Sequence, residues 1–209
     1  MSAPVDLART WTLADLETLP DDGLRYELVD GNLVVTPPTQ RHQWLGDALA
    51  TQLRADAPEG WRVVTELRLP LEEDLRIPDV VVHRWPLQHP TTDRANPLGP
   101  RDIGLLVEVV SPRTRKTDRF TKPAEYAAAG VPLFWRLETD PVLVLHPFVL
   151  DAGAYVRVDP VPLRGPAPTP WGEVVVDLGG LRADSLRGRD VLSPVQCASQ
   201  GEGDRQGAL

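Results

Sequence analysis

Two acidic residues, Asp79 and Glu108, stand inside apolar runs that are typical of buried β-strands. Asp79 lies between Pro78 and the valines at 80–82, and Glu108 lies within the run 103–110. An ionised carboxylate in such surroundings is costly unless it is paired with a cation or binds a metal. If the two strands are neighbours, both carboxylates can face one point, and Mg²⁺ takes one or two carboxylates, a carbonyl oxygen and water as ligands. The pair therefore predicts a divalent-cation site. For either acid alone, the alternative is a strand-end position that faces solvent.

A basic segment follows Glu108. Residues 113–122 contain five basic residues and one acid, whereas the whole chain has a net charge of −8. A polyanion could be received there while the remaining surface stays acidic; the alternative is an ordinary solvated surface. The candidate contacts are Arg113, Arg115, Lys116 and Arg119.

Lys122 has a separate candidate role in the same segment. It shares one helical stripe with Asp118 and Tyr126, at spacings of four residues. From that stripe a lysine could approach the cation site and stabilise charge on a phosphate or orient the attacking water. Arginine, which is always charged, is a poor proton acceptor. The alternative for Lys122 is a solvated helix face.

Other cofactor chemistries find no support in the sequence. The histidines at 42, 83, 89 and 146 show no zinc-ligand spacing, and the chain has one cysteine. We find no dinucleotide-binding, Walker or serine-hydrolase motif. His42, near the start of a helix, is expected to be a surface or capping residue.

Composition indicates one soluble domain. The chain has 209 residues, of which 42% are hydrophobic and 25% charged, which is ordinary for a globular protein. The acidic balance disfavours nonspecific coating of nucleic acid. The single cysteine excludes an intrachain disulfide, and neither a signal peptide nor an apolar run of about 20 residues is visible. We therefore expect a cytoplasmic protein with no membrane span.

Hydrophobic periodicity and turn residues predict a mixed α/β domain over residues 1–192 and a disordered tail over 193–209. Asp30-Gly31 predicts a hairpin within 24–36. Residues 103–110 are expected to form a central strand that is buried on both faces. Helices are expected at 12–19, 39–55 and 114–129, the last with Pro123 at a kink or at the first turn of its second part. Strands are expected at 61–69, 77–83, 133–137, 142–149, 155–158 and 173–178, and proline-rich loops at about 86–101 and at 159–170.

Four motifs, taken in order, resemble the Uma-two family of restriction-endonuclease-like proteins, within the PD-(D/E)XK nuclease superfamily. They are Tyr26-Glu-Leu-Val-Asp-Gly-Asn-Leu, Ile77-Pro-Asp-Val-Val-Val, Leu106-Val-Glu-Val-Val-Ser-Pro, and Asp118-x-x-x-Lys122-x-x-x-Tyr126-x-x-x-Gly130-Val-Pro-x-Phe-Trp135. The resemblance implies a single restriction-endonuclease-like domain, with a mixed central sheet flanked by helices and an N-terminal hairpin. It also implies a DNA endonuclease that uses Mg²⁺, with Mn²⁺ as an alternative.

Site residues follow from the resemblance position by position. Asp79 would be the acid of the PD element, Glu108 the second acid, and the carbonyl of Val109 a third metal ligand. The superfamily usually places a lysine two residues after the second acid, where this chain has Val110. Lys122 would act as its substitute. Glu27 would be the family's early acid, an extra ligand or water-binding group, with a plain solvent-facing strand residue as the alternative.

The departure at Val110 and the acidic charge keep two other functions open. One is a nuclease fold that no longer cleaves and serves as a binding module. The other is a metal-dependent hydrolase of a smaller phosphoester. Under the nuclease interpretation, Arg113, Arg115, Lys116 and Arg119 would hold the DNA backbone, and a homodimer is expected because cutting both strands requires two sites.

Overall fold

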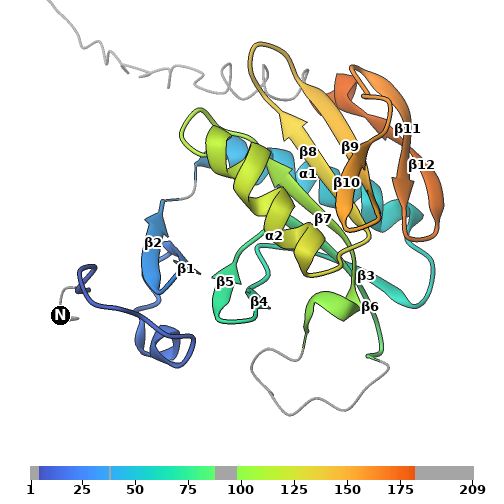
Figure 1. Ribbon diagram of the computed structural model, residues 1–209. Coiled ribbons are helices and arrows are strands. Elements are labelled where there is room, and N and C mark those ends of the chain that lie inside the picture. Colours follow the sequence, from blue (N-terminus) through green and yellow to red (C-terminus); the bar gives the residue numbers. More distant parts are fainter. Residues whose placement is uncertain (1–4, 38, 88–97, 182–209) are drawn as a thin grey trace, which may run out of the picture.

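The structure is a computed structural model that describes residues 5–37, 39–87 and 98–181. Its centre is a six-stranded sheet in the order β10-β9-β8-β7-β6-β3 (Figure 1). Strand β7 pairs antiparallel with β6 and parallel with β8, so the sheet is mixed. The strands are β3 (Trp61–Thr65), β6 (Val80–Arg84), β7 (Ile103–Val109), β8 (Leu133–Glu138), β9 (Val144–Asp151) and β10 (Ala154–Arg157).

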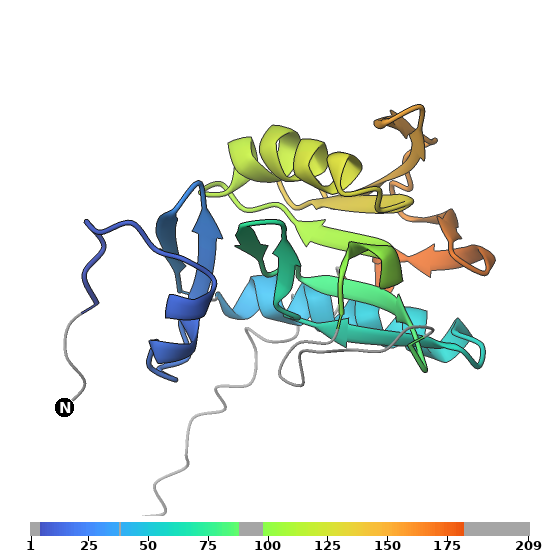
Figure 2. The same ribbon diagram turned by 60° about the horizontal axis from the view of Figure 1, so that its bottom comes forward.

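Alternation along β7 separates the two faces of this sheet. All seven residues of β7 are buried, which confirms the predicted central strand. Leu105 and Val107 pack with the apolar residues of α1 (Gln40–Asp56), whereas Leu106 packs with Tyr126 of α2 (Lys122–Ala128). Figure 2 shows the two helices on opposite faces of the sheet. Because side chains alternate along a strand, Glu108 belongs to the face that α2 covers.

A second, four-stranded sheet has the order β2-β1-β5-β4 and stands beside the larger one (Figure 1). Its hairpin joins β1 (Arg25–Val29) to β2 (Asn32–Thr36) through Asp30 and Gly31, whose φ angles are 50° and 72°. Two successive left-handed residues give the turn that suits a tight hairpin, as predicted. Strands β4 (Leu69–Leu71) and β5 (Asp74–Arg76) complete the sheet and were not predicted.

The helix predicted over 114–129 is interrupted by a π-helical turn, Thr117–Thr121, immediately before α2. Proline has no N–H, and its ring collides with the carbonyl four residues earlier, so Pro123 disfavours a regular helix through this point. The N–H of Lys122 instead bonds to the carbonyl of Thr117, five residues back. Pro123 thus opens the second part of the helix, one of the two predicted arrangements.

Two predicted elements were wrong. The strand expected over 61–69 ends at Thr65, because Glu66 takes a left-handed φ of 55°. The proline-rich segment expected as a loop contains β11 (Arg164–Thr169), which pairs with β12 (Gly172–Asp177) in a separate two-stranded sheet. Pro166 and Pro168 are two residues apart, so both missing N–H groups lie on the same side of the strand and leave the other positions free to pair.

Two predicted features lie outside the described residues: the tail 193–209 and most of the loop expected over 86–101. In the part of the chain that is described, no helix has the length and apolar character needed to cross a membrane.

Candidate active site

A cavity of about 70 Å³ opens where the β1–β2 hairpin, the start of α1, the end of β7 and the π turn meet. This volume accommodates a few water molecules or a hydrated cation. The lining is mostly charged or hydroxyl-bearing: Arg25, Glu27, Thr36, Pro37, Thr39, His42, Ile77, Glu108, Ser111, Arg113, Thr114, Asp118 and Lys122.

Asp79 is fixed beside the end of β7. Val80 pairs with Val107, so Asp79 stands next to Glu108 on the neighbouring strand, as the sequence predicts. The Asp79 carboxylate is 2% exposed, and its Oδ2 accepts a hydrogen bond of 2.7 Å from the Val109 N–H. Its Oδ1 accepts one of 2.9 Å from Arg25 Nη1. Burial raises the pKa of Asp79, but the hydrogen bond and charge of His42 and the charge of Arg25 outweigh it and hold the pKa below its usual value.

Glu108 is held by two side chains from α2. Lys122 Nζ donates to its Oε2 at 2.9 Å, and the Tyr126 hydroxyl donates to its Oε1 at 2.6 Å. Burial, together with the neighbouring carboxylates Asp79 and Asp118, raises the pKa of Glu108 to about 8 despite the opposing charge of Lys122. The predicted stripe of Asp118, Lys122 and Tyr126 thus faces the second acid.

Lys122 is the buried cation of the site. Besides Glu108, its Nζ lies 3.5 Å from Asp118 Oδ1 and 3.6 Å from Glu27 Oε1. Burial alone would lower the pKa of Lys122, but the surrounding carboxylates, Glu108 foremost, raise it well above its usual value. Lys122 therefore stays protonated and acts as a fixed positive charge rather than as a proton acceptor.

Glu27 points into this cluster from the middle of β1. Its Oε1 accepts a hydrogen bond of 2.9 Å from the Ile77 N–H, and its Oε2 lies 3.5 Å from Arg76 Nη1. Arg76 is itself buried and forms two hydrogen bonds with Glu125 of α2. These contacts place Glu27 inside the site rather than on a solvent-facing strand.

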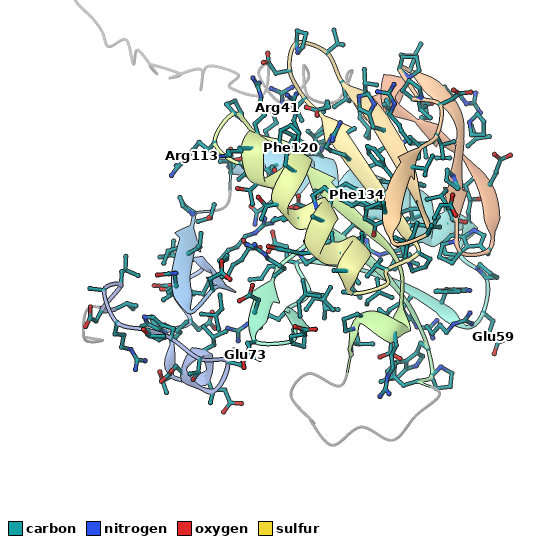
Figure 3. The ribbon with its side chains drawn as sticks, viewed as in Figure 1. Arg41, Glu59, Glu73, Arg113, Phe120 and Phe134 are labelled. Atoms are coloured by element: carbon teal, nitrogen blue, oxygen red, sulfur yellow. The ribbon has the colours of Figure 1, made fainter. Side chains whose placement is uncertain are left out.

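The structure does not bring the four predicted basic contacts together. Arg113 is exposed and lines the cavity, at the end of the helix that faces the hairpin (Figure 3). Lys116 is exposed, and Arg115 pairs with Asp140 at 2.9 Å. Arg119 donates two hydrogen bonds of 2.8 Å to Glu138, away from the cavity.

His42 was misjudged from the sequence. Its side chain is 15% exposed, its Nδ1 lies 3.1 Å from Asp79 Oδ1, and its Nε2 contacts the Val109 carbonyl oxygen. Both ring nitrogens thus face acceptors, which favours the imidazolium. Burial would lower the pKa of His42, but the hydrogen bond and charge of Asp79 raise it above its usual value. His42 therefore contacts Asp79 Oδ1 and the Val109 carbonyl oxygen, and Asp79 and Val109 are two of the residues predicted to bind the metal.

Arg25 is another site residue that sequence reasoning missed. The alternation of β1 carries the signal: Tyr26 and Leu28 are buried in the hairpin core, so Arg25 and Glu27 share the other face. Arg25 bridges Asp79 and Glu66 from that face.

Metal binding fits the chemistry of this site, although its side chains are engaged with one another. Among the described residues, no three His, Cys, Asp or Glu side chains stand ready-made around a metal position. The oxygens of Asp79, Glu108 and Val109 are nevertheless the hard donors that Mg²⁺ takes. Burial, and after it the neighbouring carboxylates, raise the pKa of Glu108, and a divalent cation at this position would favour its ionised form.

Comparison with family models identifies the family, and a solved structure supports the fold. The family model Uma2, described as "Putative restriction endonuclease", matches residues 13–169. One similar solved structure is a "putative nuclease belonging to DUF820" from Anabaena variabilis, with 16% sequence identity and a TM-score of 0.53, covering 71% of this chain and 84% of the other. No curated protein matches. The structural similarity supports the mixed α/β fold, and the family model covers more than half of the chain: the protein belongs to the Uma2 family.

Proposed function

We propose that the protein is a divalent-metal-dependent endonuclease that hydrolyses phosphodiester bonds of DNA. The observation that carries the proposal is the buried constellation of Asp79, Glu108 and Lys122. Asp79 directly precedes β6, Glu108 lies on the neighbouring β7, and Lys122 begins α2. Lys122 Nζ lies 2.9 Å from Glu108, and the Asp79 carboxylate accepts a hydrogen bond from the Val109 N–H. Membership of a family described by endonuclease activity supports the reaction class.

The metal would be held by Asp79, Glu108 and the Val109 carbonyl oxygen. When bound, Mg²⁺ or Mn²⁺ supplies an activated water and neutralises charge on the phosphate. His42 contacts two of these oxygens, so its ring must turn aside or offer a nitrogen as a further ligand.

The other site residues place positive charge near the substrate phosphate or hold Glu108 in position. Lys122, which stays protonated, stabilises negative charge that develops on the phosphate and holds Glu108 in place. Tyr126 fixes the second oxygen of Glu108. Arg113, exposed at the rim of the cavity, is placed to contact a phosphate of the substrate backbone.

A metal-dependent hydrolase of a smaller phosphoester is the second candidate. It is favoured by the small cavity and by the pairing of Arg115 and Arg119 with carboxylates, which reduces the positive charge available to a long polyanion. An inactive binding module would show affinity for DNA or protein and no turnover with any divalent metal.

The test is cleavage of supercoiled plasmid in Mg²⁺, Mn²⁺ and EDTA by wild type, Glu108→Gln and a control, Glu138→Gln. Glu138 is also a buried acid, but it does not line the cavity. We expect metal-dependent nicking by wild type and the control and none by Glu108→Gln. The same proteins are assayed on bis(p-nitrophenyl) phosphate. Turnover of this ester without plasmid cleavage would favour the second candidate. No turnover of either substrate would refute both enzyme assignments.

A further inference from the structure

Asp118 is a buried carboxyl group whose oxygens accept no hydrogen bond in the described part of the chain. Its side chain is 2% exposed. Its nearest cation is Lys122, whose Nζ lies 3.5 Å from Oδ1. A buried carboxylate without donors costs free energy, so its presence calls for a partner that the fold itself does not provide.

The backbone directs this carboxylate into the cavity. Asp118 lies in the π turn Thr117–Thr121, and it lines the cavity together with Glu108 and Lys122. Single π turns inside helices are frequent at functional sites. An asparagine would fit the same turn without placing an ionised group there, so stability alone does not explain the acid.

Lys122 cannot satisfy the carboxylates around it. Glu108, Asp118 and Glu27 all lie within 3.6 Å of its single ammonium group. Glu108 also receives the Tyr126 hydroxyl, and Glu27 receives the Ile77 N–H. Asp118 lacks such a second hydrogen bond, because the side chain of Thr114, its neighbour among the described residues, is already bonded to Ser111. Its oxygens are therefore the ones left available to a hard cation, which prefers carboxylate ligands.

We propose that Asp118 is a further residue of the divalent-cation site, binding the metal directly or through one of the metal's water molecules. This inference rests on the proposed function, because it assumes that a cation occupies the site of Asp79 and Glu108. The bound cation then offsets the free-energy cost of burying the Asp118 carboxylate, and the metal-free protein carries this cost.

The test measures Mn²⁺ binding by isothermal titration calorimetry, with no substrate present, for wild type, Asp118→Asn and the control Glu138→Gln. We expect about a 10- to 100-fold weaker affinity in Asp118→Asn and wild-type affinity in the control. In EDTA, the melting temperature of Asp118→Asn should equal or exceed that of wild type, because a buried charge has been removed. Asp118→Ala provides a second variant if Asp118→Asn folds poorly.

The possible failures are distinguishable. If wild type binds Mn²⁺ and Asp118→Asn binds it within twofold, Asp118 is only a counter-charge for Lys122, and this inference is overturned while the proposed function stands. If wild type does not bind Mn²⁺ at millimolar concentration, both are overturned. A lower melting temperature with unchanged affinity would also assign Asp118 a purely structural role.

Discussion

Replacing Glu108 by glutamine should reduce the pH dependence of stability in the metal-free protein. The pKa of Glu108 is raised from 4.5 to about 8, first by burial and then by the neighbouring acids. The folded state therefore keeps a proton that the unfolded state loses above pH 4.5. The contribution of Glu108 to the free energy of unfolding is fully present below its pKa in the unfolded state. This contribution falls as the pH rises toward 8.

The size of this change in stability follows from the shift in the pKa of Glu108. One pKa unit corresponds to 1.36 kcal/mol, so the rise to about 8 sets an upper value of about 5 kcal/mol for the stability lost across this window. His42 and Asp118 contribute in the same direction, because burial raises the pKa of Asp118 and the hydrogen bond and charge of Asp79 raise the pKa of His42. The difference between wild type and variant, rather than the slope of wild type alone, isolates Glu108.

The assay is urea unfolding in EDTA at intervals from pH 5 to pH 8.5, for wild type, Glu108→Gln and Glu138→Gln. Arg119 and Arg136 lower the pKa of Glu138, although burial acts against them. Glu138 is therefore ionised throughout this pH range, and its replacement should leave the pH dependence of the unfolding free energy unchanged. Glu108→Gln should lose much less stability than wild type between the two ends. Equal slopes in wild type and Glu108→Gln would refute a buried Glu108 of raised pKa.

Three further predictions concern the site and its support. Lys122→Met should cost about 3–5 kcal/mol in urea unfolding at pH 8, because it leaves buried carboxylates without their cation; a loss below 1 kcal/mol would show that the pair is not buried. Arg113→Ala should weaken DNA binding and reduce the dependence of the binding constant on salt concentration by about one phosphate contact. Arg119→Ala should change neither quantity, because Arg119 is paired with Glu138. Gly104→Ala should destabilise the fold by about 1–3 kcal/mol, since its Cβ would lie 2.6 Å from the Trp61 ring; an unchanged melting temperature would contradict the close packing there.

Local signals in the sequence predicted the elements that carry the site. Asp30-Gly31 sets the hairpin, apolar spacing sets α1, and the apolar run at 103–110 sets the buried β7. The missed elements lack such signals. Strands β4 and β5 have three residues each, too few for a period of two to stand out, and the prolines of β11 are tolerated only because of their spacing on an edge.

Within the site, residues were missed where their partners lie far along the chain. His42 contacts the carbonyl of a residue 67 positions away, and Arg25 contacts Asp79 across 54 positions. No local pattern encodes either contact. The four basic contacts were predicted from the charge of neighbouring residues in the sequence. The pairing of Arg119 with Glu138 depends instead on how the π turn packs against β8.

The most direct test of the central claim is plasmid cleavage by Asp79→Asn beside wild type at saturating Mg²⁺, with both proteins shown to be folded by circular dichroism. The substitution keeps the size of the side chain and removes the charge expected to bind the metal. We predict metal-dependent cleavage by wild type and none above the EDTA background by the variant. Equal cleavage by the two proteins would contradict a metal-dependent site built on Asp79.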